Sequence, residues 1–77
     1  MEQTQEYRYT TRKDQLITED GTHYTGYGIE IWSAGKRIQS VPDIFLHNSD
    51  AEKLARLCNQ LRLDPIHFME VAEDWLT

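Results

Sequence analysis

The chain has 77 residues, of which 39% are hydrophobic, and its 8 Lys and Arg against 13 Asp and Glu give a formal net charge of −5 at pH 7. A chain of this length buries only about 60% of the surface that its unfolded form exposes, so we expect a single domain, residues 1–77, with a thin core. The acidic balance argues against a nucleic acid partner, because phosphate binding requires clustered cations, and the lack of a membrane-length apolar run or a secretion signal predicts a cytoplasmic protein without a membrane partner.

The first half of the chain alternates side chains with a period of two, which is typical of β-strands. Residues 1–5 precede this pattern, and we expect them to be loose. Tyr7 and Tyr9 then share one face of an extended segment that continues to Glu19-Asp20-Gly21, where a glycine after two acidic residues suits a tight hairpin turn. The sequence therefore predicts a first strand that folds back on itself at this turn.

The returning segment, residues 22–32, carries two different faces. One face holds Tyr27, Ile29 and Ile31, and the other holds Tyr24, Gly26, Gly28, Glu30 and Trp32. Two glycines on one face indicate that another backbone or ring packs closely there. A second turn at Ser33-Ala34-Gly35-Lys36 leads into a third strand, residues 37–41, which Pro42 is expected to end. Residues 7–41 are thus predicted to form a three-stranded antiparallel β-meander.

After an apolar connector the period changes to about 3.6 residues, as in an α-helix. Ser49 and Glu52 have the spacing of a capping box, in which each side chain would bond to the other residue's backbone amide. The helix that follows has one apolar stripe, formed by Ala51, Leu54, Leu57, Cys58 and Leu61. This stripe predicts the face that packs on the sheet.

A second helix is predicted to start at Asp64-Pro65, with Asp64 as the N-cap and Pro65 in the first helical position, where its missing amide hydrogen costs nothing. Its apolar face contains Phe68, Val71, Ala72 and Trp75. We therefore expect Trp75 to be buried, so that truncating it would cost about 3–5 kcal/mol. The two helices together span residues 49–76.

These elements give an α+β fold of order β-β-β-α-α, with the helical pair packed on one face of the sheet. The other face of the sheet would present either Tyr24 and Trp32 or the row of Tyr7 and Tyr9, depending on the strand register. An exposed aromatic sheet face would suit a homodimer or a partner contact.

The chain resembles a small family of bacterial domains of unknown function that is associated with Gram-positive bacteria and mobile elements. The resemblance covers most of residues 7–76 and rests on short motifs: Leu16-Ile17-Thr18-Glu19-Asp20-Gly21, Tyr27-Gly28-Ile29, Pro42-Asp43-Ile44-Phe45, Leu57-Cys58-Asn59, and Pro65-Ile66-His67 with Val71-Ala72-Glu73-Asp74. It implies no activity, cofactor or binding residue.

Polar residues on the second helix form the main candidate site. His67, Glu70 and Asp74 fall within about 60° of one another around the helix axis, so they could bind a divalent metal or a small molecule. A zinc site normally needs three or four protein ligands, which favours two other interpretations: a solvated helix face, or a partner surface that includes Glu73 as well. The sequence contains no glycine-rich phosphate-binding motif, so no cofactor is predicted.

The single cysteine and the basic residues offer weaker candidates. Cys58 lies within the apolar stripe, where a thiol behaves as a small hydrophobe and cannot form a disulfide within this chain. The basic residues of the strand region could bind single-stranded RNA beside Tyr7 and Tyr9, but solvated edge-strand charges explain them equally well.

The sequence as a whole predicts a protein that is not an enzyme. The leading hypothesis is a small acidic interaction module that binds an unidentified protein partner and forms a homodimer, using Glu70, Glu73 and Asp74 or the sheet residues Tyr24 and Trp32. The alternative hypothesis is a metal-binding or small-molecule-binding protein that uses His67, Glu70 and Asp74.

Overall fold

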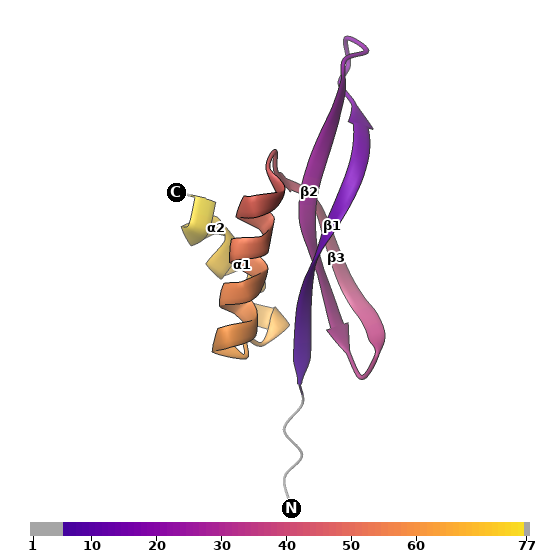
Figure 1. Cartoon of the computed structure of the whole chain (residues 1–77). Helices are drawn as coiled ribbons and strands as arrows, with labels where there is room; N and C mark the ends of the chain where they lie inside the picture. The colour runs from indigo at the N-terminus through magenta and orange to yellow at the C-terminus, as the bar shows by residue number, and fades with distance from the viewer. Residues whose placement is uncertain (1–5, 77) are drawn as a thin grey trace, which may run out of the picture.

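The computed structural model describes residues 6–76 and confirms the α+β fold (Figure 1). The elements follow in the order β1 (Tyr7–Ile17), β2 (His23–Ser33), β3 (Lys36–Phe45), α1 (Asn48–Leu61), the 3-10 turn η1 (Pro65–His67) and α2 (Phe68–Leu76). Both helices lie on the same side of the sheet. The expectation of a loose segment at residues 1–5 falls outside the described residues.

The sheet is a meander of order β1-β2-β3, and every neighbouring pair is antiparallel. The predicted first turn is present, since the Thr18 amide donates to the Thr22 carbonyl at 2.9 Å and Gly21 adopts a φ of 87°. Tyr9 pairs with Ile31 across β1 and β2, and both side chains are buried beneath the helices. This register decides the open question of the two faces: the tyrosine row points inward, and Tyr24 and Trp32 lie on the outer face.

The prediction that Pro42 ends the third strand is wrong, because β3 continues to Phe45. Pairing with β2 passes from Ile29 opposite Val41 to Tyr27 opposite Phe45, so residues 42–44 bulge out opposite Gly28. Proline is tolerated here because β3 is an edge strand and the bulge removes the need for a ladder hydrogen bond.

The bulge explains why β2 contains glycine on its outer face. A Cβ atom built on Gly28 would lie 2.1 Å from the Val41 carbonyl oxygen and 2.8 Å from the Cα of Pro42. The predicted close approach of another backbone to this face is therefore confirmed.

The predicted capping box is also wrong. The N-cap is His47, two residues before the expected Ser49, and it forms no side-chain cap. Ser49 consequently lies inside the first turn, and the Glu52 carboxylate instead accepts a hydrogen bond from Asn48 Nδ2 at 2.7 Å. In contrast, the predicted start at Asp64 is confirmed, since its carboxylate accepts from the Ile66 amide and Pro65 opens η1.

The core is formed by one side of the sheet and the facing stripes of both helices: Tyr9, Ile29, Ile31, Ala51, Leu54, Ala55, Cys58, Phe68 and Ala72. The Tyr9 and Phe68 rings stack with their centroids 5.8 Å apart. α1 contacts the strands along its length, whereas α2 packs mainly against α1 and η1. The first turn of α2 is thus the part that reaches the sheet.

Two residues expected in the core lie largely outside it, Leu61 at 58% exposure and Trp75 at 41%. Leu61 belongs to the last turn of α1, after which Arg62 adopts a left-handed conformation and turns the chain away. Trp75 lies near the end of α2, and the C-terminal end of α2 lies on the far side of α1 from the strands (Figure 1). A correct helical period therefore gave a wrong burial, because the period alone does not say how far the neighbouring element extends.

Candidate functional site

A side chain of α1 occupies the edge of β1. The Tyr9 amide donates to Asn59 Oδ1 at 2.8 Å, and Asn59 Nδ2 donates to the Tyr9 carbonyl at 2.9 Å. The side-chain amide therefore makes the pair of bonds that a neighbouring strand would make at this position.

Beyond Tyr9 the same edge of β1 continues along the strand toward the first hairpin turn. Backbone groups alternate in direction along a strand, so those of Thr11, Lys13 and Gln15 point to the same side as those of Tyr9, away from β2. Within residues 6–76, no hydrogen bond joins these outward backbone groups to another residue. Three successive N–H and C=O pairs are thus available at this edge.

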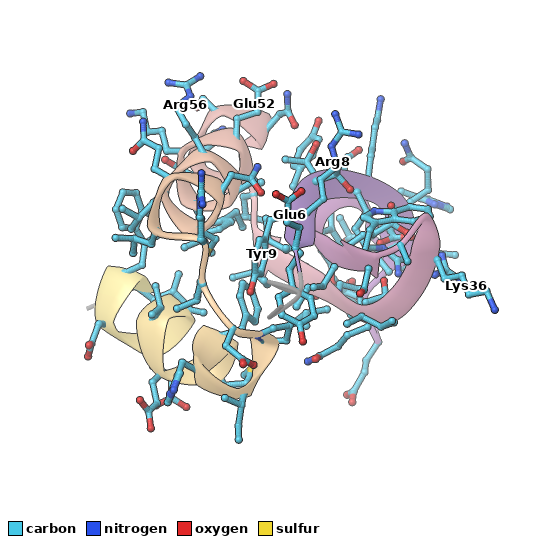
Figure 2. The ribbon with its side chains drawn as sticks, turned by 90° about the horizontal axis from the view of Figure 1, so that it is seen from below. Glu6, Arg8, Tyr9, Lys36, Glu52 and Arg56 are labelled. Atoms are coloured by element: carbon cyan, nitrogen blue, oxygen red, sulfur yellow. The ribbon has the colours of Figure 1, made fainter. Side chains whose placement is uncertain are left out.

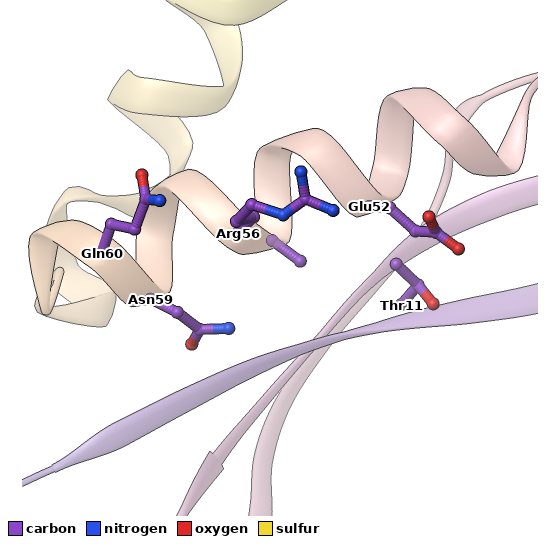
Figure 3. A pocket seen from close by; sticks show the side chains of 6 residues that line it. Thr11, Glu52, Arg56, Asn59 and Gln60 are labelled. Carbon is purple, nitrogen blue, oxygen red and sulfur yellow. The ribbon is translucent and has the colours of Figure 1, made fainter.

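A groove of about 490 Å³ runs between α1 and this edge (Figure 3). It is open to solvent, and it is lined by Thr11 of β1 and by Glu52, Ala55, Arg56, Asn59 and Gln60 of α1. Figure 2 shows Glu52, Arg56 and Arg8 projecting on one side of the molecule, whereas Tyr9 points between the sheet and the helices. Charged side chains of both signs therefore border the entrance of the groove.

The outer sheet face carries a polar network around Tyr24 and Trp32. Trp32 Nε1 donates to Thr10 Oγ1 at 2.8 Å, and the Tyr24 hydroxyl donates to Asp43 Oδ2 at 2.9 Å. This bond to Asp43 raises the pKa of Tyr24 above its ordinary value. The polar ends of both predicted partner residues are thus satisfied within the chain, and both side chains are half-buried.

Two ion pairs lie on the same outer face. Arg12 binds Asp14 in a bidentate manner at 2.6 and 2.7 Å and also donates to Ser40, while Arg37 pairs with Glu30 at 2.9 Å. The hydrogen bond from Arg12 holds the pKa of Asp14 below its ordinary value. Tyr24 and Trp32 thus lie on the outer face among engaged polar groups, and a role of this face in dimerisation stays a prediction.

The acidic residues of α2 lie on its exposed side. His67 Nδ1 lies 3.8 Å from Glu70 Oε2, and these two side chains are 60% and 81% exposed. In the part of the chain that the structure describes, no three His, Cys, Asp or Glu side chains converge to hold a metal ion. The metal site at His67, Glu70 and Asp74 stays a prediction and gains no support from this geometry.

Large apolar side chains border the acidic residues of α2. Met69, Trp75 and Leu76 are 49%, 41% and 54% exposed. At about 100° per residue, Met69 and Leu76 project next to Glu73, whereas Trp75 projects on the side of the buried Phe68. This helix therefore shows solvent an acidic stripe with an apolar margin at Met69 and Leu76.

The interior holds two groups that are kept protonated. Cys58 is fully buried as predicted, and burial raises the pKa of its thiol to about 11. The Tyr9 hydroxyl donates to the Leu63 carbonyl at 2.6 Å, and burial is the main cause that raises its pKa. Neither group is prepared to act as a nucleophile at neutral pH.

A family model matches residues 1–77, and its description is a family of unknown function, DUF6514. The chain belongs to the DUF6514 family. Searches of the curated proteins and of the solved structures found no match. The resemblance to a family of unknown function is thus confirmed, whereas the bacterial and mobile-element association stays a prediction. Among the residues described, no helix has the length and apolar character needed to cross a membrane.

Sequence reasoning missed the groove and its two central residues, Asn59 and Thr11. Asn59 falls next to the apolar stripe of α1, where a polar side chain ordinarily faces solvent. An amide at the border of an apolar stripe is the only signal that could have suggested a bond to a strand edge, and it does not say which strand. The groove exists only because the fold places α1 beside β1, two segments far apart in the sequence.

Proposed function

We propose that this protein is a non-enzymatic protein-interaction module, and that the exposed side of α2 is part of its contact surface. The observation that carries the proposal is the exposure of Met69, Trp75 and Leu76 on one nine-residue helix. Single exposed apolar residues are common on protein surfaces, but Met and Trp are enriched where proteins meet their partners. Met69 and Leu76 project on the same side of this short helix, and such an exposed pair beside the carboxylates favours a contact surface.

The carboxylates of the same helix add a charge preference. Glu70 and Glu73 are exposed on the side of α2 that faces away from Phe68 and Ala72. A partner with a basic surface would be attracted to this acidic stripe, and apolar side chains of the partner would then cover Met69 and Leu76. Binding should therefore weaken with salt but persist in part, because the apolar contact is not screened.

The chemistry of the described residues supports binding over catalysis. The one thiol is buried with a raised pKa, and two ion pairs on the outer sheet face, Arg12 with Asp14 and Arg37 with Glu30, engage their charges with one another. A nucleophile needs a nearby base and an accessible position, and Cys58 lacks accessibility.

The experiment compares capture of partners by matched variants from a lysate of the protein's own source. One variant replaces Glu70, Glu73 and Asp74 with alanine, a second carries Met69→Ala and Leu76→Ala, and a control carries Glu19→Ala and Lys53→Ala at exposed positions outside α2. Circular dichroism and thermal melting check that each variant is folded. We expect both α2 variants to lose the partner that the wild type and the control retain.

Two results would contradict this proposal. Retention of the same partner by both α2 variants would remove α2 from the contact surface. Recovery of the wild-type chain with no other protein, at low and at high salt, would overturn the assignment as an interaction module.

A further inference from the structure

We propose that the edge of β1 at Thr11, Lys13 and Gln15 binds an extended, acidic segment of a partner protein, which joins the sheet as a fourth strand. We call this edge and the groove beside it the β1 edge site. The inference rests on the proposed function as an interaction module, but it concerns a surface separate from α2 and adds the conformation and charge of the ligand.

The β1 edge site offers a complete row of backbone partners. Each of its three residues points one N–H and one C=O away from β2, and a strand at about 4.8 Å from β1 would bond with all of them. Asn59 already makes the equivalent pair of bonds with Tyr9 at 2.8 and 2.9 Å. The incoming strand would continue a row of edge bonds that the chain itself begins.

The surroundings leave room for such a strand. α1 closes the edge at Tyr9 through Asn59, and the β1–β2 hairpin projects beyond the end of the helix (Figure 1). The open groove between α1 and Thr11 would receive the side chains that the added strand directs toward the helices. Addition of a strand to an exposed sheet edge is a recurrent mode of peptide recognition.

The side chains at the site favour a carboxylate on the ligand. Lys13 shares the inward-facing side of β1 with Thr11, and Arg56 lines the groove. Lys13 and Arg56 are both exposed, and within residues 6–76 neither of them forms an ion pair. Glu52, the one acidic lining residue, accepts a hydrogen bond from Asn48. An acidic residue opposite Lys13 would therefore find cations without partners.

A second copy of this chain fits the edge less well. Antiparallel pairing of two β1 edges about their centre would set two Lys13 side chains directly opposite each other, and like charges in such pairs are destabilising. Lysine at a strand edge is also a common guard against self-pairing. The same residue that opposes a second copy would attract an acidic strand.

The antiparallel geometry gives a strict test. The residue opposite Lys13 has its side chain on the same face as Lys13, and its own N–H and C=O point at β1. In a peptide that alternates glutamate and valine, the glutamates facing Lys13 are therefore the residues that bond to β1, whereas the valine N–H groups point to solvent. Backbone N-methylation of the glutamates removes the bonds, and N-methylation of the valines does not.

The probe is a blocked seven-residue peptide with alternating valine and glutamate, titrated into the isotope-labelled full chain and followed by NMR. Before addition, the amides of Thr11, Lys13 and Gln15 should exchange with solvent faster than the amide of Tyr9. On addition, these three amides should shift and become protected. We expect glutamate N-methylation to weaken binding about tenfold or more and valine N-methylation to change it less than about twofold.

Charge and surface controls complete the experiment. Lys13→Glu should weaken binding of the glutamate peptide and strengthen binding of a matched lysine peptide. Lys36→Glu, an equal charge change elsewhere in the sheet, should have little effect on the affinity for either peptide. The variant that lacks Glu70, Glu73 and Asp74 should bind the peptide normally. A peptide result and an α2 result can therefore fail independently of each other.

Three outcomes would overturn the proposal. The first is the absence of any shift at the β1 edge site, and the second is an equal loss of binding for both patterns of N-methylation. The third is protection of the Thr11 amide that rises with protein concentration and accompanies dimer formation in sedimentation, which would make a second copy the occupant.

Discussion

The side chain of Asn59 takes the place of a neighbouring strand at Tyr9 and so helps to hold three elements together. Its amide bonds with both backbone groups of Tyr9, whose ring stacks on Phe68 and whose hydroxyl bonds to the Leu63 carbonyl. Tyr9 is thereby fixed through its backbone, its ring and its hydroxyl at once. The start of β1, the end of α1 and the first turn of α2 are joined at this one residue.

Asn59→Ala removes both bonds to Tyr9 and leaves two backbone groups of a buried residue without their partner. We expect the free energy of unfolding to fall by about 1–3 kcal/mol, as measured by urea denaturation. Gln60→Ala, one residue further on the exposed side of the same helix, serves as the control and should change it by less than about 0.5 kcal/mol. Equal effects of the two substitutions would show that the link to Tyr9 is not stabilising.

Stability should decline at alkaline pH because folding keeps two acidic protons in place. The pKa of Cys58 is raised to about 11 and that of Tyr9 is also raised, both mainly by burial. The unfolded chain would release these protons first, so the stabilisation is fully present below about pH 8 and is lost as the pH rises toward the native values. Urea denaturation at neutral and alkaline pH measures this decline.

Cys58→Ala separates the two contributions. The variant should be less stable at neutral pH because it leaves a small cavity, but its stability should fall less steeply between about pH 8 and pH 10. If the free energy of unfolding falls with pH equally steeply in the wild type and the variant, the thiol does not contribute to the alkaline loss of stability.

At the scale of elements, the bulge in β3 and the glycines of the neighbouring strand β2 require each other. Residues 42–44 bulge over Gly28, and Asp43, with a φ of 55°, places its carboxylate against Gly26 and within reach of the Tyr24 hydroxyl. The bulge and the glycines depend on each other, since a side chain on β2 would occupy the space of the Val41–Pro42 backbone.

Gly28→Ala should disturb this pair of strands more than any exposed substitution. The added Cβ would meet the backbone of Val41 at 2.1 Å, which cannot be relieved by rotating a side chain. We expect a loss of about 1–3 kcal/mol or more in the free energy of unfolding. NMR should show shifts concentrated in residues 40–45, and Lys36→Ala, at the exposed start of β3, should leave those residues unchanged.

The two large aromatic residues of α2 should differ in their importance for stability. Phe68 is fully buried against Tyr9, whereas Trp75 is 41% exposed. Phe68→Ala should cost about 3–5 kcal/mol, and Trp75→Ala should cost less than half as much, both measured by chemical denaturation. A larger cost for Trp75→Ala would mean that α2 packs more closely along its second half than the structure shows.

At the scale of the whole molecule, the fold is long and thin rather than spherical. The principal extents are 55 × 27 × 18 Å, and the radius of gyration of 13.8 Å exceeds the value of about 11.5 Å expected for a compact domain of this length. The β1–β2 hairpin causes this extension, because its tip projects beyond the helices (Figure 1). The hairpin therefore places strand edges where a partner can reach them.

Small-angle scattering tests this shape and the oligomeric state together. A monomer should give a forward intensity that corresponds to 9.1 kDa and a pair-distance distribution with an extended tail. A mass twice as large would indicate a homodimer, which was predicted from an exposed aromatic sheet face. A single compact maximum at the monomer mass would mean that the hairpin folds back on the helices.

The sequence by itself determined the order of the elements, the first hairpin turn, the start at Asp64, the burial of Cys58 and the close packing over Gly28. These features follow from local periodicity and from the conformational preferences of single residues, which act within a few positions of the chain. The tertiary structure alone decided the register that turns Tyr9 inward, the extension of β3 past Pro42, the exposure of Trp75 and the bond between Asn59 and Tyr9. Each of these depends on contacts between segments far apart in the chain, whose relative placement no local pattern specifies.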